Sequence, residues 1–302
     1  MKLIHQTSTK ANPVNYFLDF VLERLLRRKT SITDVSTPGD FYVKTKDYIG
    51  NQIIAYNLYE KRELMALIHF LTPIKSFLKE GIGLDVGANI GNHSAFLAPY
   101  LQEVHAFEPN PSAFRLLELN TQNISNIKAH NFGLSKSKVA TTLYVDSQNV
   151  GGSSTIKGRG FSNEEIEILL VPLDSLELYN SKLQIIKIDV EGCEYEVLLG
   201  AHKTIQRSMP IILLEQFPSD FDSSNQNCIS LLFDFGYEFA WMAHDSENQS
   251  KAPRRMKRVI NLVLHREVTF FFTNPKVPRG HYPMLIAIPP RFFSLLRVNS
   301  LD

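Results

Sequence analysis

The sequence predicts an α/β fold in which a mostly parallel sheet is flanked by helices, and three observations favour this class. From Gly81 onward, short apolar runs alternate with segments of helical periodicity, as expected of βαβ units. A glycine-containing turn, Gly87 to Gly91, lies between the first of these runs and a helical segment, as in nucleotide-binding loops. The composition, 44% hydrophobic and 21% charged over 302 residues, is that of an ordinary globular chain.

The apolar runs predict the strands and the periodic segments predict the helices. Strands are expected near residues 82–86, 103–107, 127–131, 184–189 and 210–215, with an edge strand near 141–145 and later strands near 237–243 and 283–288. Helices are expected at 94–101, 111–122 and 194–207, and a further helix at 60–78 leads into this region.

The first residues predict a helical extension. Residues 13–29 are amphipathic, and Arg27, Arg28 and Lys29 follow at the end where a helix dipole favours cations. This helix either packs on the core or a partner, or lies on a membrane surface and gives a peripheral membrane contact. Residues 1–40 are therefore assigned to an N-terminal helical extension and linker.

The rest of the chain is assigned to one domain, 41–290, and a C-terminal tail, 291–302. Within the domain, an insertion at about 245–281 carries a basic run from Lys251 to Arg258. The run is interpreted as a solvated helix face or as a docking surface for an anionic acceptor.

Charge and cysteine usage exclude several classes of protein. Lys and Arg number 32 against 31 Asp and Glu, so no global field favours nucleic acid, and no nucleic-acid partner is expected. Cys193 and Cys228 form neither a disulfide framework nor a spaced metal motif, and we predict no metal. The start of the chain lacks the pattern of a signal peptide, so a cytoplasmic location is expected. No feature of the sequence indicates an oligomeric state.

The turn after the first predicted strand is the most informative segment. Gly87 and Gly91 allow a sharp turn and a close approach to a ligand, and Ala88 and Asn89 lie between them. Asn89 replaces the middle glycine of a dinucleotide-binding loop, and asparagine tolerates left-handed backbone angles. Asp85, two positions before Gly87, would repel a pyrophosphate but suits the ammonium and sulfonium cations of S-adenosylmethionine.

Two further residues complete the predicted cofactor site. Glu108 follows the second strand, 21 positions after Gly87, at the spacing of an acid that binds both ribose hydroxyls. Asn131 follows the third strand and is a candidate for the adenine or an ordinary turn residue.

The stretch from about Ile49 to Glu215 resembles the FkbM family of methyltransferases. The motifs that carry the resemblance are Asp85-Val86-Gly87-Ala88-Asn89-Ile90-Gly91, Phe107-Glu108-Pro109, Gly151-Gly152-Ser153-Ser154, Val171-Pro172-Leu173-Asp174-Ser175-Leu176 and Ile186-Lys187-Ile188-Asp189-Val190-Glu191-Gly192. The resemblance implies a Rossmann-like class I methyltransferase with a seven-stranded sheet. It further implies S-adenosylmethionine as cofactor and O-methylation of a hydroxyl on a sugar, glycan or natural product.

Methyl transfer to a hydroxyl needs a group that accepts its proton, because such a hydroxyl is nearly as weak an acid as water. Asp189 and Glu191 end the fourth main strand, and Glu215 ends the fifth, at the edge where open α/β sheets bind ligands. Asp189 and Glu191 are the first candidates for the base, and Glu215 ranks behind them. Lys187 is expected to pair with one of these carboxylates.

Two other classes of function compete with methyl transfer. A nicotinamide-dependent sugar oxidoreductase or epimerase shares the fold logic but calls for a Tyr/Lys catalytic pair, and no such pair is convincingly placed. A non-catalytic protein that retains a nucleoside pocket for assembly is the third hypothesis, and the acids at 189, 191 and 215 speak against it.

Overall fold

The structure is a computed structural model, which describes part of the chain. The described residues are 2–9, 34–36, 41–44, 48–145, 155, 164–176, 182–221, 227–244, 267–274 and 277–297. The predicted helix at 13–29 and the basic run from Lys251 to Arg258 lie outside them, so both stay predictions.

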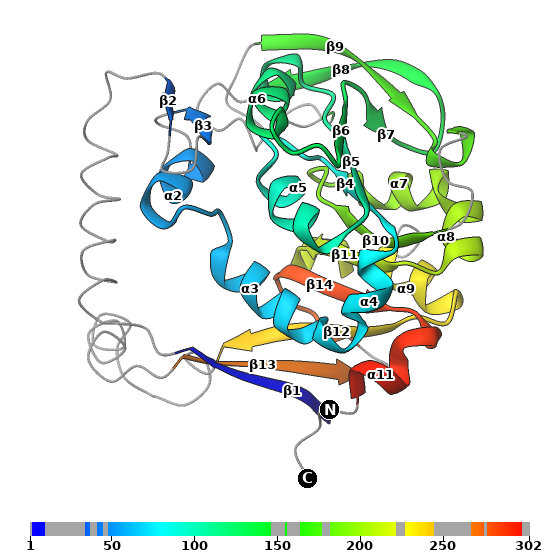
Figure 1. Ribbon diagram of the computed structural model, residues 1–302. Coiled ribbons are helices and arrows are strands. Elements are labelled where there is room, and N and C mark those ends of the chain that lie inside the picture. Colours follow the sequence, from blue (N-terminus) through cyan, green and yellow to red (C-terminus); the bar gives the residue numbers. More distant parts are fainter. Residues whose placement is uncertain are drawn as a thin grey trace.

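One large sheet runs through the molecule (Figure 1). Its strands, in spatial order, are β1 (Lys2–Thr9), β13 (Glu267–Asn274), β12 (Glu238–His244), β14 (Tyr282–Ile288), β11 (Ile211–Gln216), β10 (Leu183–Ile188), β4 (Ile82–Val86), β5 (Glu103–Phe107) and β6 (Ile127–His130). The seven strands from β12 to β6 form the predicted sheet. Six of them run in one direction, because β14 alone is antiparallel to its neighbours β11 and β12 within this set. The predicted α/β class and the seven-stranded arrangement are confirmed.

Two strands extend this sheet beyond the prediction. β13 pairs antiparallel with β12, and β1 pairs antiparallel with β13 at the edge of the sheet. The expectation of a helical extension is therefore wrong for residues 2–9. Their partner strand lies near the other end of the sequence, and local periodicity does not reveal such a pairing.

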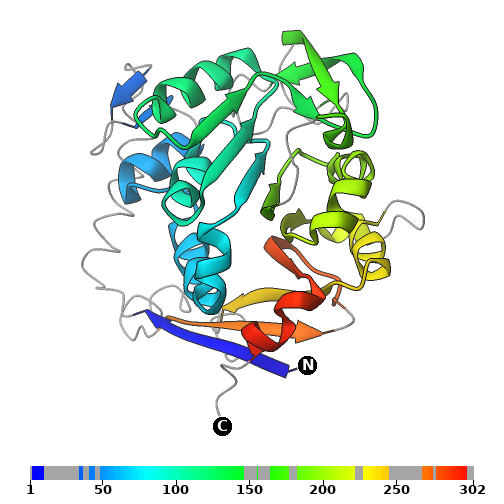
Figure 2. The same cartoon turned by 45° about the vertical axis from the view of Figure 1, so that its right-hand side comes forward.

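Helices cover both faces of the sheet (Figure 2). Helices α3 (Lys61–Phe70), α4 (Lys75–Lys79) and α5 (Asn92–Leu97) pack on one face, where Leu67, Leu97 and Ile185 belong to one buried cluster. Helices α7 (Glu194–Gly200), α8 (His202–Ser208) and α9 (Cys228–Asp234) pack on the opposite face. Helix α6 (Pro111–Thr121) follows β5, and α2 (Tyr48–Tyr56) precedes α3.

Three predicted helices are shorter than expected or divided. The segment 60–78 is divided at Thr72–Ile74, where Pro73 follows the end of α3 and a 3-10 turn replaces the α-helix. The segment 94–101 begins earlier, at Asn92, and ends in a 3-10 turn at Ala98–Tyr100. The segment 194–207 is divided at Ala201, after Gly200, whose Cα lies so close to the Ser135 carbonyl that a Cβ would be 2.0 Å from it.

The predicted C-terminal tail begins inside the core instead. Pro290–Phe292 forms a 3-10 turn and α11 (Phe293–Arg297) follows it. Phe292 and Leu296 are buried in the cluster that includes α3 and α5. Their apolar spacing places one side of this short helix against the sheet, so the domain extends at least to residue 297.

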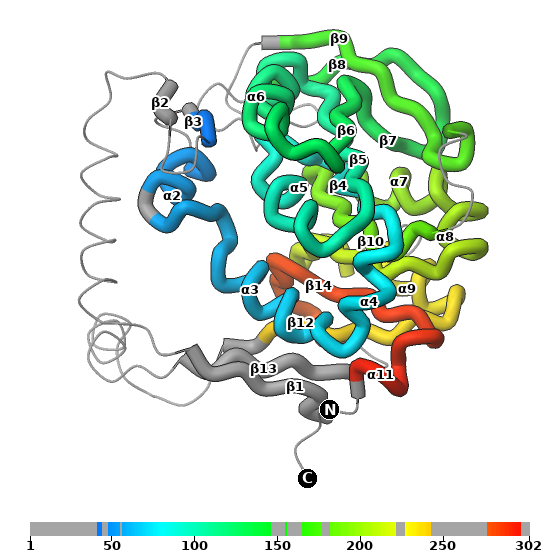
Figure 3. The backbone as a smooth tube through the Cα atoms, viewed as in Figure 1, coloured from blue at the N-terminus to red at the C-terminus, as the bar shows by residue number. Residues whose placement is uncertain are grey.

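Besides the large sheet, the described residues form two small sheets, and the three-stranded one lies at the top of the view in Figure 3. β7 (Gly133–Leu134), β9 (Glu164–Val171) and β8 (Val139–Val145) form a three-stranded sheet, so the strand expected near 141–145 does not edge the main sheet. β2 (Asp34–Ser36) pairs with β3 (Tyr42–Lys44). Within the described ranges, every helix is too short or too polar to cross a bilayer.

Candidate functional site

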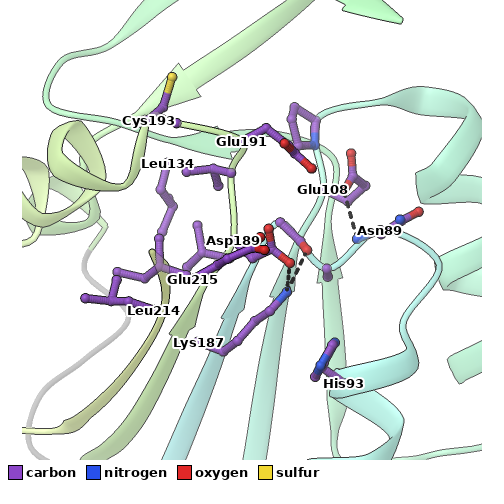
Figure 4. Close-up of a pocket in the computed structure, with 18 of the residues that line it drawn as sticks. Asn89, His93, Glu108, Leu134, Lys187, Asp189, Glu191, Cys193, Leu214 and Glu215 are labelled. Carbon is purple, nitrogen blue, oxygen red and sulfur yellow. Dashed lines mark hydrogen bonds and ion pairs between the residues drawn. The ribbon is translucent and has the colours of Figure 1, made fainter. Parts of the chain in front are cut away.

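A cavity of about 550 Å³ opens at the carboxyl ends of β4, β10 and β11 (Figure 4). Its floor is formed by the strand ends, and apolar side chains of the three-stranded sheet, such as Leu143, Ile168 and Leu170, line it from the other side. The carboxylates that line it are those of Glu60, Glu108, Asp189, Glu191, Glu196 and Glu215. Among the described lining residues, Lys187 is the one lysine or arginine.

The glycine-containing turn brings the ends of β4 and β10 together. Gly87 has a φ of +79°, and a Cβ there would lie 1.9 Å from the Asp189 carbonyl oxygen. Asn89 has a φ of 50°, which confirms the predicted left-handed turn at this position. Gly87, Ala88 and Asn89 line the cavity, whereas Gly91 precedes the first residue of α5 and packs against Leu117 of α6.

Asp85 lies beneath the cavity and does not line it. Its side chain is fully buried on the face covered by α5, where Oδ2 accepts a hydrogen bond of 2.6 Å from Ser94 Oγ. Its Oδ1 lies 3.5 Å from Lys187 Nζ, and the two residues are direct partners in the pairing of β4 with β10. Strand alternation thus turns Asp85 under the helix, away from the cavity lining, and its role toward the cations of the cofactor stays a prediction.

Lys187 connects three parts of the site. Its Nζ lies 3.2 Å from Asp189 Oδ2 and donates a 3.2 Å hydrogen bond to the Gly87 carbonyl, in addition to its pairing with Asp85. Burial opposes the charge of Lys187, but the carboxylates of Asp189 and Asp85 outweigh burial and raise its pKa. The ammonium group thus stays charged and fixes the glycine-containing turn against β10, as Figure 4 shows.

Glu108 is a buried carboxylate at the end of β5 that faces the cavity. Its two oxygens accept hydrogen bonds of 2.8 Å from the backbone N–H groups of Asn89 and Asn110. Burial raises the pKa of Glu108 to about 7, and these two hydrogen bonds pull in the opposite direction. A solvated loop charge is excluded by this geometry.

Asn131 lies outside the cavity. Its side chain is exposed and donates a hydrogen bond of 3.0 Å to the Glu108 carbonyl. This side chain holds the loop that carries Glu108, as a turn residue would, and its contact with the adenine stays a prediction.

The three predicted catalytic acids all line the cavity, and their environments differ. Asp189 pairs with Lys187. Glu191 has a φ of 54°, in a loop whose Val190 and Gly192 backbone N–H groups donate to the Glu194 carboxylate. The loop after β10 is thereby held in a conformation that turns Glu191 toward the cavity.

Glu215 has a perturbed ionisation. Burial, together with the negative charges of Asp189 and Glu60, raises its pKa to about 8. Its Oε1 lies 3.3 Å from Nε2 of His281. A carboxylate with a pKa near neutrality is well matched to accepting a proton.

The cavity lining also contains residues that sequence reasoning did not assign to the site. Asn92 accepts a 3.0 Å hydrogen bond from the Tyr59 N–H and donates one of 3.1 Å to the Tyr59 carbonyl. This double contact places Glu60 beside His93, whose Nε2 lies 3.1 Å from Glu60 Oε2. The sequence carries no local signal for Glu60, since the turn between α2 and α3 reaches the cavity only through the tertiary fold.

Two further predictions concern the loop after β8 and metal binding. Gly151 to Ser154 lie outside the described residues, while Thr155 lines the cavity and its Oγ1 lies 3.2 Å from Cys193 Sγ. In the described part of the chain, no group of three or more His, Cys, Asp or Glu side chains is arranged to hold a metal ion. The expectation of no metal stays a prediction.

Comparison with known families identifies the domain. The family model of the methyltransferase FkbM domain matches residues 85–239, which contain the glycine turn, Glu108 and all three acids. The chain belongs to the FkbM methyltransferase family. This membership confirms the resemblance seen in the sequence and favours methyl transfer over nicotinamide chemistry.

Two curated relatives of this FkbM domain are methyltransferases. One is the hexuronic acid methyltransferase AglP of Haloferax volcanii, 31% identical over 136 residues that cover 43% of this chain and 54% of AglP. The other is methyltransferase 1 of Beauveria bassiana, 27% identical over 152 residues that cover 42% of this chain and 61% of the relative. The matched part thus spans little more than half of either relative.

Two solved structures align with this chain at low sequence identity. The FkbM methyltransferase of Methylobacillus flagellatus KT aligns with a TM-score of 0.36 at 15% identity, over 86% of this chain and 60% of its own. Precorrin 8W decarboxylase of Methanobacterium thermoautotrophicum aligns with a TM-score of 0.39 at 14% identity, over 75% of this chain and 88% of its own.

Proposed function

We propose that this FkbM-family chain is an S-adenosylmethionine-dependent O-methyltransferase that acts on a sugar or glycan hydroxyl. The observation that carries the proposal is the cavity at the ends of β4, β5, β10 and β11, in which buried Glu108 and five other carboxylates outnumber the one lysine among the described lining residues. Such a lining suits a cationic nucleoside better than a phosphate-bearing one. A volume of about 550 Å³ is that of a small-molecule site. The hexuronic acid named for AglP supports a sugar as acceptor.

The chain's own residues fit the proposed ligand. Glu108 remains able to accept hydrogen bonds from two adjacent ribose hydroxyls, since each carboxylate oxygen can accept more than one. Gly87 presents backbone without a side chain at the cavity wall. S-adenosylmethionine supplies the methyl group and its sulfur as leaving group.

Glu215 is our candidate for the group that accepts the proton. As the acceptor oxygen bonds to the methyl carbon, its hydroxyl proton passes to the Glu215 carboxylate, and the electron pair of the broken C–S bond stays on sulfur. Asp189 is tied to Lys187, so its charge positions the turn and the donor rather than taking up a proton. Glu191 lines the cavity and is assigned to binding.

Transfer of a labelled methyl group into a panel of sugars and glycans tests the proposal. We expect labelled product with at least one sugar acceptor, and a loss of roughly 10²- to 10⁴-fold in kcat for Glu215→Gln, the range of general base catalysis. Glu118→Gln, an exposed glutamate of α6, is the matched control. Label on a nitrogen atom, or an unchanged kcat for Glu215→Gln, would contradict the assignment.

A further inference from the structure

The cavity wall around Glu215 combines a carboxylate with an exposed aromatic ring. Phe217, two residues after Glu215, lines the cavity and is 38% exposed. The His281 ring stacks on it, with centroids 4.8 Å apart and an angle of 13° between the planes. The same His281 contacts Glu215 through Nε2. One histidine therefore supports both an apolar platform and a carboxylate at the cavity wall.

Apolar rings beside hydrogen-bonding groups are suited to sugars. The C–H face of a pyranose ring packs on an aromatic face, while its hydroxyls need polar partners. Phe217 supplies the first kind of contact, and Glu215 and Glu60 supply the second. Glu215 lies on β11 and Glu108 follows β5, and β10 and β4 separate these two strands in the sheet, so a sugar beside Glu215 leaves the nucleoside position at Glu108 free.

The charges of this wall restrict which sugars can bind. Glu60 and Glu215 are paired in the structure with the rings of His93 and His281. Lys187, the one lysine or arginine among the described lining residues, already lies between Asp85 and Asp189. A carboxylate on the sugar would thus approach the like charges of Glu60, Asp189 and Glu191, and the described lining offers no lysine or arginine besides Lys187 to pair with it.

We infer that the acceptor is a sugar without a carboxylate, held by Phe217 and the carboxylates of Glu60 and Glu215. This inference rests on the proposed function and names its substrate class. It separates this chain from the hexuronic acid in the name of its relative AglP. The sugar binds in the cavity itself, and packing on the ring of Phe217 sets the orientation of the sugar there.

Matched sugars test the inference. Methyl glucoside, methyl glucosaminide and methyl glucuronide, and their galacto and manno counterparts, are compared as acceptors by kcat/KM at low salt. We expect each glucuronide-type sugar to be poorer than its neutral counterpart by roughly tenfold or more, a gap that narrows as salt is added. Where the protein does not methylate a series of sugars, their affinities for the S-adenosylhomocysteine complex are measured by NMR titration. We expect these affinities to rank the sugars in the same order.

Three variants sharpen the result. Glu60→Gln should reduce the difference in kcat/KM between neutral and carboxylate sugars. Glu118→Gln, at an exposed position, should leave this difference unchanged. Phe217→Ala should raise KM for every sugar at least about fivefold, since it removes the buried apolar contact. Phe233→Ala, which removes a ring that is 52% exposed on α9 away from the cavity, should not.

The outcomes distinguish the inference from the function on which it rests. A protein that binds no S-adenosylmethionine contradicts the proposed function. A protein that binds it and methylates or binds the glucuronide as well as the glucoside overturns the inference alone.

Discussion

At the scale of single residues, the site depends on how each charge is compensated. Asp85 and Lys187 are both buried, so water does little to stabilise either charge. The ammonium group of Lys187 forms ion pairs with Asp85 and Asp189, and it also donates a hydrogen bond to the Gly87 carbonyl. The chemistry at the cavity therefore depends on an ion pair that lies partly behind its wall.

Removing the lysine should destabilise the whole protein. Lys187→Met leaves the fully buried Asp85 without its cation, and loss of one partner of a buried pair costs about 3–5 kcal/mol. Urea unfolding measures this loss as a lower midpoint. The double variant Asp85→Asn/Lys187→Met should recover much of the stability, because the one charge that then lacks its cation is Asp189, whose side chain is partly exposed to water. Equal stability of the single and double variants would contradict this account.

Glu215 predicts a pH dependence of stability. Its pKa is raised in the folded protein to about 8, so the folded state holds a proton that the unfolded state releases near pH 4.5. The stability that the fold gains by holding this proton is fully present below about pH 4.5 and is lost as the pH rises to about 8. At pH 8, Glu215→Gln should therefore have a free energy of unfolding about 1–2 kcal/mol higher than that of the wild type. A pKa unit is worth about 1.4 kcal/mol, and the effect is reduced because the side chain is partly exposed.

Thermal unfolding at pH 5 and pH 8 checks this expectation. The variant and the wild type should differ little at pH 5 and clearly at pH 8. A constant difference between the two pH values would show that Glu215 does not hold its proton in the fold.

At the scale of elements, the strand ends were predictable and the partnerships between distant elements were not. Alternating runs located β4, β5, β10 and β11 within one or two residues, and the acids that follow them line the cavity as expected. Asp85 differs from them, because its side chain points under α5, which the position of a residue at a strand end does not reveal. Glu60 and Phe217 were missed because a turn and a loop, rather than a motif, carry them.

The turn between β4 and α5 is the element on which the cavity most depends. Gly87→Ala would place a Cβ 1.9 Å from the Asp189 carbonyl and should push β4 and β10 apart at the cavity. We expect a loss of stability of about 2 kcal/mol or more together with weaker cofactor binding. Chemical denaturation and calorimetry measure the two effects.

Gly236→Ala is the matched control for the backbone strain. Gly236 also has a positive φ, +84°, but a Cβ there meets no atom closer than 3.6 Å. Gly236→Ala should lower the free energy of unfolding by about 1 kcal/mol through backbone strain alone, and the affinity for the cofactor should not change. Equal losses at both glycines would mean that the contact with Asp189 is unimportant.

At the scale of the whole molecule, the first and last parts of the chain both complete the methyltransferase domain. β1 forms one edge of the sheet beside β13. The 3-10 turn at Pro290–Phe292 and the helix α11 add Phe292 and Leu296 to the core. Neither was predictable from local periodicity, because both depend on packing between distant parts of the sequence. The active-site wall shows the same dependence, since Tyr59 and Glu60 are held by Asn92 of α5.

The central claim is that the acidic cavity binds S-adenosylmethionine through Glu108. Calorimetric titration of the whole chain with S-adenosylmethionine, S-adenosylhomocysteine and NAD tests it most directly. We predict binding of both sulfur ligands, no comparable binding of NAD, and a loss of about 1.5–3 kcal/mol for Glu108→Ala, the value of a hydrogen bond to a charged group. Preference for NAD, or unchanged affinity in Glu108→Ala, would contradict the account.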